Sequence, residues 1–559
     1  MKPNMRWQLL FAFTGFGLVL ALLSYHIQYE SRLCTERFAT SGGVFTEGVL
    51  GAPLHINPLL AGNNPVDRQL VDLIFDGLTT YEDGELVPAL AESWSISEDG
   101  RTVRFKLRDD VTWHDGQPFT AEDVAYTYSL IQDEAFTGDG ALQRLWESVV
   151  IRVVSPQEIE FELREPYAGF LEATTMGILP AHLLENVAAE ALAEAPFNRS
   201  PVGTGPFQVE PGQDWEASGQ LLLTPFAAAW PQGVRIGSLG FYFFQSREAL
   251  LEAYRQGAIQ AINDVTPIML PQVIQLPDVR LFSAPASRYS TLLFNTSPDA
   301  STATQSREVR KALALALDRE LIVDEALSGQ GIVQTGPYLP SSWAYQPAAL
   351  TIAAGNPVSA TLGLEAAGWI VPEGSDVREN GGERLILRFL VYDTPTNRAL
   401  AAAVETELEQ AGAAPLLSLF SDWRDYRRAL ADGEFDLALV DVDAPGDPDL
   451  YDFWSQEAII RGQNYAGWNR RRASEALEDG RRAWTVAERK PFYEAFLRLY
   501  SEDLPEVTLF QHIYTYAVRD SIEGVEIGRI DDTRDRYASL ASWIVAYENL
   551  AVLCPEDRT

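Results

Sequence analysis

Cysteine and basic residues are scarce in this sequence. The chain of 559 residues has only two cysteines, which excludes a disulfide-dense scaffold and a zinc site built from four cysteines. Lysine and arginine together number 43 against 79 aspartates and glutamates, so the formal net charge is −36. Such an acidic surface repels phosphate backbones, and we expect no nucleic-acid partner. With 46% hydrophobic residues, the composition is that of a globular protein with several lobes.

Sequence motifs of catalysis are also missing. No serine lies in the G-x-S-x-G pattern of esterases, no G-x-x-x-x-G-K-S/T phosphate loop occurs, and none of the five histidines lies in H-E-x-x-H. Gly203 and Gly205 begin a pattern like a dinucleotide-binding loop, but Gln208 stands where the third glycine belongs. We therefore expect neither an enzyme nor a cofactor, and a secreted hydrolase is the least favoured alternative.

An acidic stretch over residues 441–452 partly resembles a calcium-binding loop. Its positions 1, 3, 6, 9 and 12 match those of an EF-hand. However, Pro445 at position 5 offers no side-chain oxygen, and Asp452 at position 12 is shorter than the usual glutamate. Because residues 435–440 have the pattern of a strand, we favour a loop at the carboxyl end of that strand. Ligands bind at such loops in open α/β sheets, and we expect no metal.

One long apolar run lies near the N-terminus. No charged side chain occurs from Trp7 to Tyr25, and a helix of this length spans roughly 28 Å, close to the hydrocarbon core of a bilayer. Lys2 and Arg6 precede the run, which favours a cytoplasmic N-terminus and an extracytoplasmic body. We expect residues 1–41 to form a membrane segment and stalk that anchor the body to the cytoplasmic membrane.

Two other fates of this N-terminal region stay open. Residues 39–41 (Ala-Thr-Ser) have the small-x-small pattern of a signal-peptidase site, although they lie well beyond the apolar run. Cleavage there would remove the anchor and release the body. Lipidation of Cys34 is disfavoured, because Arg32 and Leu33 stand where small residues are needed.

The rest of the chain shows alternating helix and strand patterns. Residues 101–107 alternate polar and apolar side chains as a half-buried strand does, and Thr120 begins the capping-box pattern of a helix. A helix, a glycine and a short apolar strand recur around Gly257 and again around Gly433. Glycine ends such helices because it tolerates the left-handed conformation. These patterns predict layered α/β structure.

Short motifs along the body occur together in a fixed order. They are Phe75-Asp-Gly-Leu78, Val87-Pro-Ala-Leu-Ala-Glu-Ser-Trp94, Phe105-Lys-Leu-Arg108, Trp113-His-Asp-Gly-Gln-Pro-Phe-Thr-Ala-Glu-Asp-Val124, Pro201-Val-Gly-Thr-Gly-Pro-Phe207, Phe294-Asn295, Val309-Arg-Lys-Ala-Leu313, Ala316-Leu-Asp-Arg319, Ala366-Ala-Gly-Trp369, Asp447-Pro448 and Glu502-Asp-Leu-Pro505. In this order and spacing they resemble the family 5 extracellular solute-binding proteins, which are the receptors of oligopeptide, dipeptide and nickel ABC importers. Most motif residues can also be explained as turn or core positions, so the resemblance predicts the fold better than the ligand.

The resemblance implies an α/β protein with the two-lobed clamshell of type II periplasmic binding proteins and an inserted subdomain in the first lobe. The assignment is residues 42–85, 205–285 and 505–559 to a discontinuous first lobe, residues 86–204 to the inserted subdomain and residues 286–504 to the second lobe. Chain crossings near residues 283–286 and 504–505 would then form the hinge.

The resemblance also implies a transport function. The protein would capture a peptide-like or other small solute by closing its lobes, as a monomer in the periplasm or at the cell surface. It would then deliver the solute to ABC permease subunits, whose ATPases supply the energy. A membrane-anchored solute sensor acting through a partner is the alternative. The six residues before the apolar run are few for a signalling output.

The resemblance points to five candidate ligand-binding residues. In peptide-binding members a tryptophan before the last helix–strand unit lines the cleft, and Trp423 matches it. An acidic residue in the following loop holds the peptide amine, and here Asp443 and Asp447 are offset substitutes, because Ala444 and Pro445 occupy its usual place. Two further candidates lie in a first-lobe loop that faces the cleft in relatives, namely Asn63 and Asn64.

The two cysteines form a candidate disulfide. If the predicted topology holds, Cys34 and Cys554 both lie on the oxidising side of the membrane, where paired thiols tend to be oxidised. Both ends of the body belong to the same lobe in the family fold, so a bridge between them is plausible. Two unrelated thiols on terminal segments are the alternative.

Overall fold

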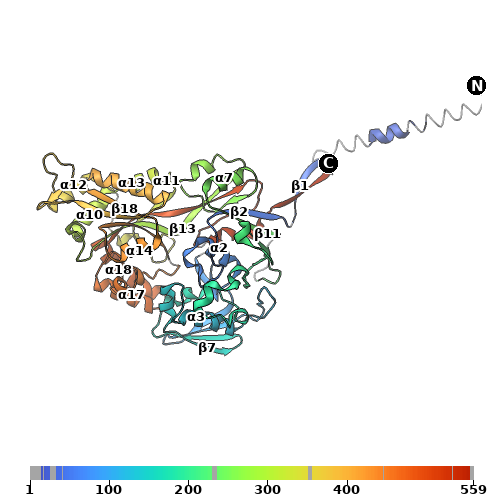
Figure 1. The fold of residues 1–559 in the computed structure, drawn as a ribbon, viewed down its shortest axis with the longest axis horizontal. Coiled ribbons are helices and arrows are strands. Elements are labelled where there is room, and N and C mark those ends of the chain that lie inside the picture. The colour runs from blue at the N-terminus through green and yellow to red at the C-terminus, as the bar shows by residue number, and fades with distance from the viewer. Residues whose placement is uncertain are drawn as a thin grey trace, which may run out of the picture.

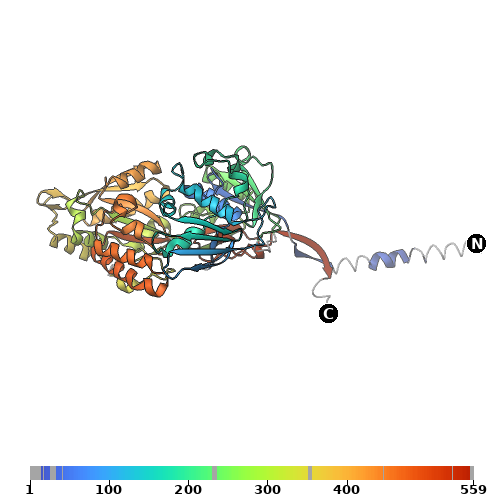
Figure 2. The same cartoon turned by 90° about the horizontal axis from the view of Figure 1, so that it is seen from below.

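The computed structural model describes residues 14, 16, 18–25, 33–40, 42–82, 84–229, 236–350, 355–444, 446–531 and 533–553. An α/β body makes up most of the molecule, and a narrow ribbon with the N-terminal helical residues projects from it (Figure 1, Figure 2). Among the residues so described, no helix combines the length and the apolar character needed to cross a bilayer. Much of the predicted membrane segment and stalk lies outside these ranges.

One mixed sheet of 11 strands runs through both lobes. Its strands in spatial order are β18 (Ala414–Phe420), β17 (Ile386–Tyr392), β19 (Leu437–Asp443), β13 (Val279–Phe294), β20 (Glu506–Arg519), β12 (Ala261–Ile262), β2 (Val44–Leu50), β11 (Ser238–Phe244), β10 (Gln220–Pro225) and β9 (Phe207–Val209), with β14 (Gly331–Val333) paired to β20. β17 to β19 belong to the second lobe, and β2 and β9 to β12 belong to the first. The clamshell expected from the motifs is thus built on a sheet that both lobes share.

β13 and β20 are the strands that join the lobes. Early in β13, Ala284 packs in the first-lobe core, whereas Leu292 packs in the second-lobe core. The register of β13 against β20 shifts between Pro285 and Tyr289, and such bulges bend a strand. This bend lies at the first predicted crossing, near residues 283–286.

β20 crosses between the lobes later than the sequence suggests. It begins at Glu506, after the predicted crossing at 504–505, and Phe510 still packs in the second-lobe core. Tyr514 is the first residue of β20 in the first-lobe core. The change from the second-lobe core to the first-lobe core thus falls within β20, between Phe510 and Tyr514.

The inserted subdomain has its own small sheet but shares the core of the first lobe. Its strands are β5 (Ala91–Ile96), β6 (Thr102–Leu107), β8 (Glu158–Glu162) and β7 (Val150–Ser155), in that order. Its helical segments are α3 (Ala121–Gln132), α4 (Gly140–Trp146), η2 (Ala168–Thr174), α5 (Ala181–Leu184), η3 (Ala189–Glu194) and η4 (Pro196–Arg199). The predicted strand and the predicted Thr120 capping box are both confirmed. Phe105 and Leu70 belong to the same buried cluster, so the subdomain and the first lobe form one body.

Helices cover both faces of the shared sheet. In the first lobe they are η1 (Ala61–Asn63), α2 (Pro65–Ile74), α6 (Trp215–Ser218), α7 (Arg247–Arg255), α8 (Leu270–Val273), η6 (Thr533–Tyr537) and η7 (Leu540–Ser542), with a hairpin of β3 (Thr79–Glu82) and β4 (Glu85–Pro88). In the second lobe they are α9 (Thr302–Gln305), α10 (Arg307–Ala316), α11 (Arg319–Leu327), η5 (Pro347–Ala349), α12 (Pro357–Ala366), α13 (Pro395–Gln410), α14 (Trp423–Ala431), α15 (Tyr451–Trp454), α16 (Ala458–Arg461), α17 (Arg471–Arg482) and α18 (Val486–Asp503), beside the hairpin of β15 (Glu379–Asn380) and β16 (Glu383–Arg384). The predicted glycine stops are confirmed at Gly257 and Gly433, which have φ of 76° and 68°.

A separate two-stranded ribbon joins the two ends of the chain. β1 (Leu33–Thr40) pairs antiparallel with β21 (Ala546–Leu553), and Cys34 lies opposite Val552. In Figure 1 this ribbon leads from the body toward the N-terminal helical residues. Cys554 lies outside the described residues, so the predicted bridge remains a prediction. The pairing does confirm that the two ends of the body lie together.

Candidate ligand-binding cleft

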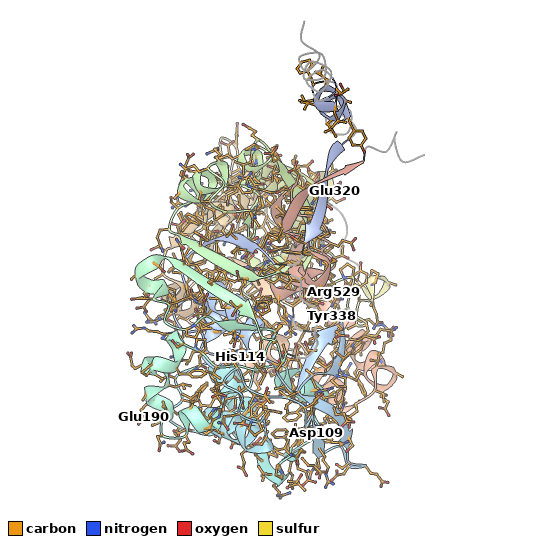
Figure 3. The ribbon with its side chains drawn as sticks, turned by 90° about the vertical axis from the view of Figure 1, so that its right-hand side faces the viewer. Asp109, His114, Glu190, Glu320, Tyr338 and Arg529 are labelled. Carbon is orange, nitrogen blue, oxygen red and sulfur yellow. The ribbon has the colours of Figure 1, made fainter. Side chains whose placement is uncertain are left out.

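A cavity of about 380 Å³ lies between the lobes. From the first lobe it is lined by residues of 58–84 and 529–535, and from the subdomain by residues of 172–177. From the second lobe it is lined by residues of 337–343 and 444–450. Figure 3 labels one residue from each side of this cavity, Arg529 and Tyr338, near the middle of the molecule. We call this space the inner cavity.

The inner cavity carries charges of both signs. Its basic lining residues are Arg68, Arg529 and Arg534, and its acidic ones are Asp72, Glu172, Asp531 and Asp535. Arg529 donates from Nε to Oδ2 of Asp531 at 2.8 Å, and Arg68 donates from Nη1 to the carbonyl of Gly62 at 2.8 Å. Such a lining suits a solute that bears both a cationic and an anionic group.

A second cavity, of about 440 Å³, lies beside the inner one, within the body formed by the first lobe and the subdomain. Its lining comes from the end of α2 and the residues after it, from β3, from residues 89–90 and 111–112 of the subdomain, from residues 204–207 and 228, and from residues 534–541. Four residues line both this cavity and the inner one and so lie between them, namely Asp72, Tyr81, Arg534 and Asp535. Of the residues that the structure describes, none from the second lobe lines this cavity, so lobe closure would not enclose a solute there.

Asp447, a predicted ligand anchor, is engaged by another side chain. Its carboxylate forms a two-pronged ion pair with Arg489 of α18, with N–O distances of 2.5 and 2.6 Å. Burial lowers the pKa of Arg489, but the hydrogen bond and charge of Asp447 outweigh it and hold that pKa above its ordinary value. Gly446 and Pro448 on either side line the inner cavity, whereas the Asp447 carboxylate points into the second lobe.

Asp443, the other predicted anchor, lies at the exposed end of β19. Its side chain is 71% exposed and lies 3.6 Å from Nε of Arg288. Asp441, two residues earlier, is held by Arg288, Ser290 and His512. Asp443 does not line the inner cavity, although its neighbour Ala444 does.

Two other predicted residues, Trp423 and Asn64, do not line the inner cavity. Trp423 starts α14, is 41% exposed and packs edge-on against Tyr392 at a centroid distance of 5.3 Å. Asn64 caps α2: its Oδ1 accepts from the Val66 N–H at 2.9 Å, and its Nδ2 donates to the carbonyl of Ala52 at 3.0 Å. The side chain of Asn63 lies outside the described residues.

Glu172 is the cleft residue that sequence analysis missed. It lies in η2 of the subdomain, and its two carboxylate oxygens accept the backbone N–H groups of Gly446 and Asp447, each at 2.8 Å. Burial is the main reason that its pKa rises to about 7, and the charge of Asp447 adds to the rise. No motif marks it, because its partners lie about 270 residues away in the sequence. The contact joins the subdomain to the second lobe, so the structure is a closed form.

Further contacts that do not involve Glu172 also join the subdomain to the second lobe. Glu165 accepts hydrogen bonds from Arg482 at 3.1 and 2.8 Å. Arg481 lies between the rings of Tyr167 and Tyr451, with its guanidinium carbon 4.5 and 4.4 Å from their centroids. These residues border an outer cavity of about 990 Å³ between the subdomain and the second lobe.

The family model for bacterial extracellular solute-binding proteins, family 5 Middle, matches residues 85–458. The chain belongs to this family. The resemblance drawn from the motifs and the predicted α/β clamshell are thereby confirmed. Members of the family are extracytoplasmic transport receptors and not enzymes, and both statements hold for this chain.

Curated relatives match most of the chain at low identity. The oligopeptide-binding protein AppA of Bacillus subtilis (strain 168) is 25% identical over 522 residues, which are 90% of this chain and 92% of that protein. The dipeptide-binding protein of Escherichia coli (strain K12) is 23% identical over 503 residues, 85% of this chain and 90% of that protein. The nickel-binding periplasmic protein of the same organism is 26% identical over 370 residues, 64% of this chain and 67% of that protein.

Solved structures show the same fold. The AppA protein from Bacillus subtilis in complex with a nonapeptide aligns with a TM-score of 0.74 and 22% identity, covering 91% of this chain and all of that one. NikA from Brucella suis in complex with Fe(III)-EDTA aligns with a TM-score of 0.77 and 20% identity, covering 89% of this chain and all of that one. At these identities the likeness concerns the fold.

Proposed function

We propose that this protein is the solute receptor of an ABC importer, which binds a peptide-like or other small solute in the inner cavity and delivers it to permease subunits. The observation that carries this proposal is the position of the inner cavity, which is lined by both lobes and bridged by Glu172. A solute bound there touches both lobes and so favours the closed form. The peptide- and nickel-binding relatives support the same role.

The size and charge of the inner cavity narrow the solute class. About 380 Å³ is near the lower end of the range for pockets that enclose small molecules, roughly 300–1,000 Å³. Its acidic and basic groups lie within one space, which suits a zwitterion such as a short peptide. Arg529 and Asp531 pair with each other in this space, and each could exchange that contact for the oppositely charged group of such a solute.

We expect the molecule to contract when a solute binds. Two bodies joined by β13 and β20 can rotate about the bend in those strands, so the solute-free protein should populate an open form. Small-angle X-ray scattering with and without a mixture of two- to five-residue peptides measures the radius of gyration, which should fall on binding. An unchanged radius, together with binding heat in calorimetry, would contradict the clamshell mechanism.

We also propose that the N-terminal segment keeps the receptor at the membrane. Of the apolar run 7–25, the described residues are helical, and their large side chains are exposed, for example Phe16 at 63% and Leu18 at 66%. Exposed apolar side chains on a helix are unfavourable in water and favourable in lipid. The β1–β21 ribbon would then hold the body at a distance from the bilayer.

A Cys34–Cys554 bridge would fasten that ribbon. Cys34 lies opposite Val552, two residues before Cys554, and a bridge would close a loop of about 520 residues with at most roughly 5 kcal/mol of stabilisation. We expect non-reducing peptide mapping of the protein from a membrane fraction to recover the two cysteines in one linked peptide pair. Recovery of both as separate free-thiol peptides would contradict the bridge.

A further inference from the structure

The two interlobe cavities meet at a single side chain. The inner cavity lies between the first lobe and the second, and the outer cavity lies between the subdomain and the second lobe. Among the described residues that line these two spaces, only Glu172 lines both. It therefore stands at the boundary between about 380 Å³ and about 990 Å³ of interlobe space.

Glu172 closes the boundary between the inner and outer cavities by accepting hydrogen bonds from backbone N–H groups. Its two carboxylate oxygens accept hydrogen bonds from the N–H groups of Gly446 and Asp447 at 2.8 Å. These hydrogen bonds form a contact between the subdomain and the second lobe, which we call the Glu172–loop contact. Just beyond this loop, Leu450 lines the inner cavity and Tyr451 lines the outer one. A solute that passes from one cavity to the other must displace this contact.

The loop side of the Glu172–loop contact is fixed by two further contacts. Asp447 is fixed by its ion pair with Arg489. Gly446 packs so closely on the ring of Tyr81 that a Cβ there would lie 2.3 Å from it. Because the loop is fixed by these contacts, the side chain of Glu172 is the group that can move to break the Glu172–loop contact.

We propose that Glu172 is the residue that limits the length of the solute, confining it to the inner cavity while its carboxylate bonds to Gly446 and Asp447. A longer peptide-like solute enters the outer cavity only when Glu172 leaves, and its own carbonyl or carboxylate oxygens then accept the two freed N–H groups. This inference rests on the proposed function, since it concerns the solute of the same cleft.

The outer contacts make this inference testable by substitution. Arg481 stays stacked between Tyr167 and Tyr451 and paired with Asp449 whether or not Glu172 is present. Glu172→Ala should therefore open the passage without separating the lobes. Glu172→Gln keeps the shape of the side chain but leaves one acceptor oxygen for two donors, so it should weaken the Glu172–loop contact without abolishing it. Glu165→Gln, which touches only the outer ion pair with Arg482, is the matched control.

The experiment measures the size of bound solutes. Wild type and the three variants are equilibrated with an equimolar pool of two- to eight-residue peptides and, separately, with a small-molecule bacterial extract. Retained compounds are then identified by mass spectrometry. We expect the ratio of retained five-residue to two-residue peptides to rise at least tenfold in Glu172→Ala and by less in Glu172→Gln. It should stay unchanged in Glu165→Gln, and heavier compounds should be retained from the extract.

Each outcome bears on a different claim. The same size distribution in wild type and in both Glu172 variants would overturn the length limit and leave the receptor function standing. Retention of nothing from either pool by any of the proteins would contradict the receptor function and the length limit with it. If Glu172→Ala fails to fold, as seen by circular dichroism, Glu172→Gln decides: an unchanged distribution in this variant overturns the inference.

Discussion

Replacing Arg536 by methionine should lower the free energy of unfolding of the first lobe by about 3–5 kcal/mol. Arg536 is fully buried, and its Nη2 donates to Oε1 of Glu47, which is 1% exposed, at 2.8 Å. Glu47 also accepts hydrogen bonds from Gln69, Tyr516 and Tyr537 at 2.9, 2.7 and 2.8 Å. Without Arg536 these neutral donors would face an uncompensated buried carboxylate in the middle of β2, and burying a lone charge is costly.

Urea denaturation followed by tryptophan fluorescence measures this loss, because Trp543 packs on Tyr516 beside the ion pair. The matched control is Arg255→Met, which removes an exposed ion pair with Glu252 on α7 of the same lobe and should cost under about 1 kcal/mol. Adding Glu47→Gln to Arg536→Met should restore part of the stability, since no buried charge then remains. A loss as small as that of the control would show that the buried pair does not hold β2 to the C-terminal segment.

Local features of the fold could be predicted because their causes are local. The capping box at Thr120 needs only residues three apart, and the helix stops at Gly257 and Gly433 need only a residue that adopts positive φ. The family motifs likewise lie in turns and core positions of single elements. They gave the correct architecture for the same reason that they said little about the solute.

The lobe boundary in β20 could not be predicted from the sequence. Residues 506–518 have one continuous strand pattern of apolar and polar residues, and Gln511 and His512 do not by themselves mark the change from one core to the other between Phe510 and Tyr514. The change depends on which elements pack on each end of the strand. That information is spread over the whole chain rather than held in the strand.

The lining of the cleft was the hardest feature to predict from the sequence, for two physical reasons. Asn64 precedes Pro65 at a helix start, and this pattern is typical of an N-cap, which is the role the structure shows. The sequence therefore carried a local explanation for Asn64 that competed with ligand binding. Glu172 and Arg489, by contrast, acquire their roles from partners far along the chain, and no spacing rule reveals such pairs.

Asp447→Asn should lower the free energy of unfolding of the second lobe by about 3–5 kcal/mol. The side chain of Arg489 is 4% exposed, and Asp447 is its anionic partner in the buried ion pair. Arg489 also donates hydrogen bonds to two neutral groups, the hydroxyl of Tyr493 at 2.7 Å and the carbonyl of Gly480 at 3.2 Å. An asparagine offers no compensating charge, so the buried guanidinium destabilises α18 and the loop that carries Gly446.

The same substitution at Asp443 is the matched control, because that side chain is 71% exposed and its loss should change stability by less than about 0.5 kcal/mol. Urea denaturation of both variants gives the stability difference, and calorimetry with a free-amine peptide and its N-acetylated form gives the binding difference. If Asp447→Asn unfolds like wild type but loses tenfold affinity for the free-amine peptide alone, its carboxylate serves the solute and not Arg489. If the stability falls and restoring charge balance with Arg489→Met recovers it, Asp447 acts by fixing the loop against which Glu172 closes.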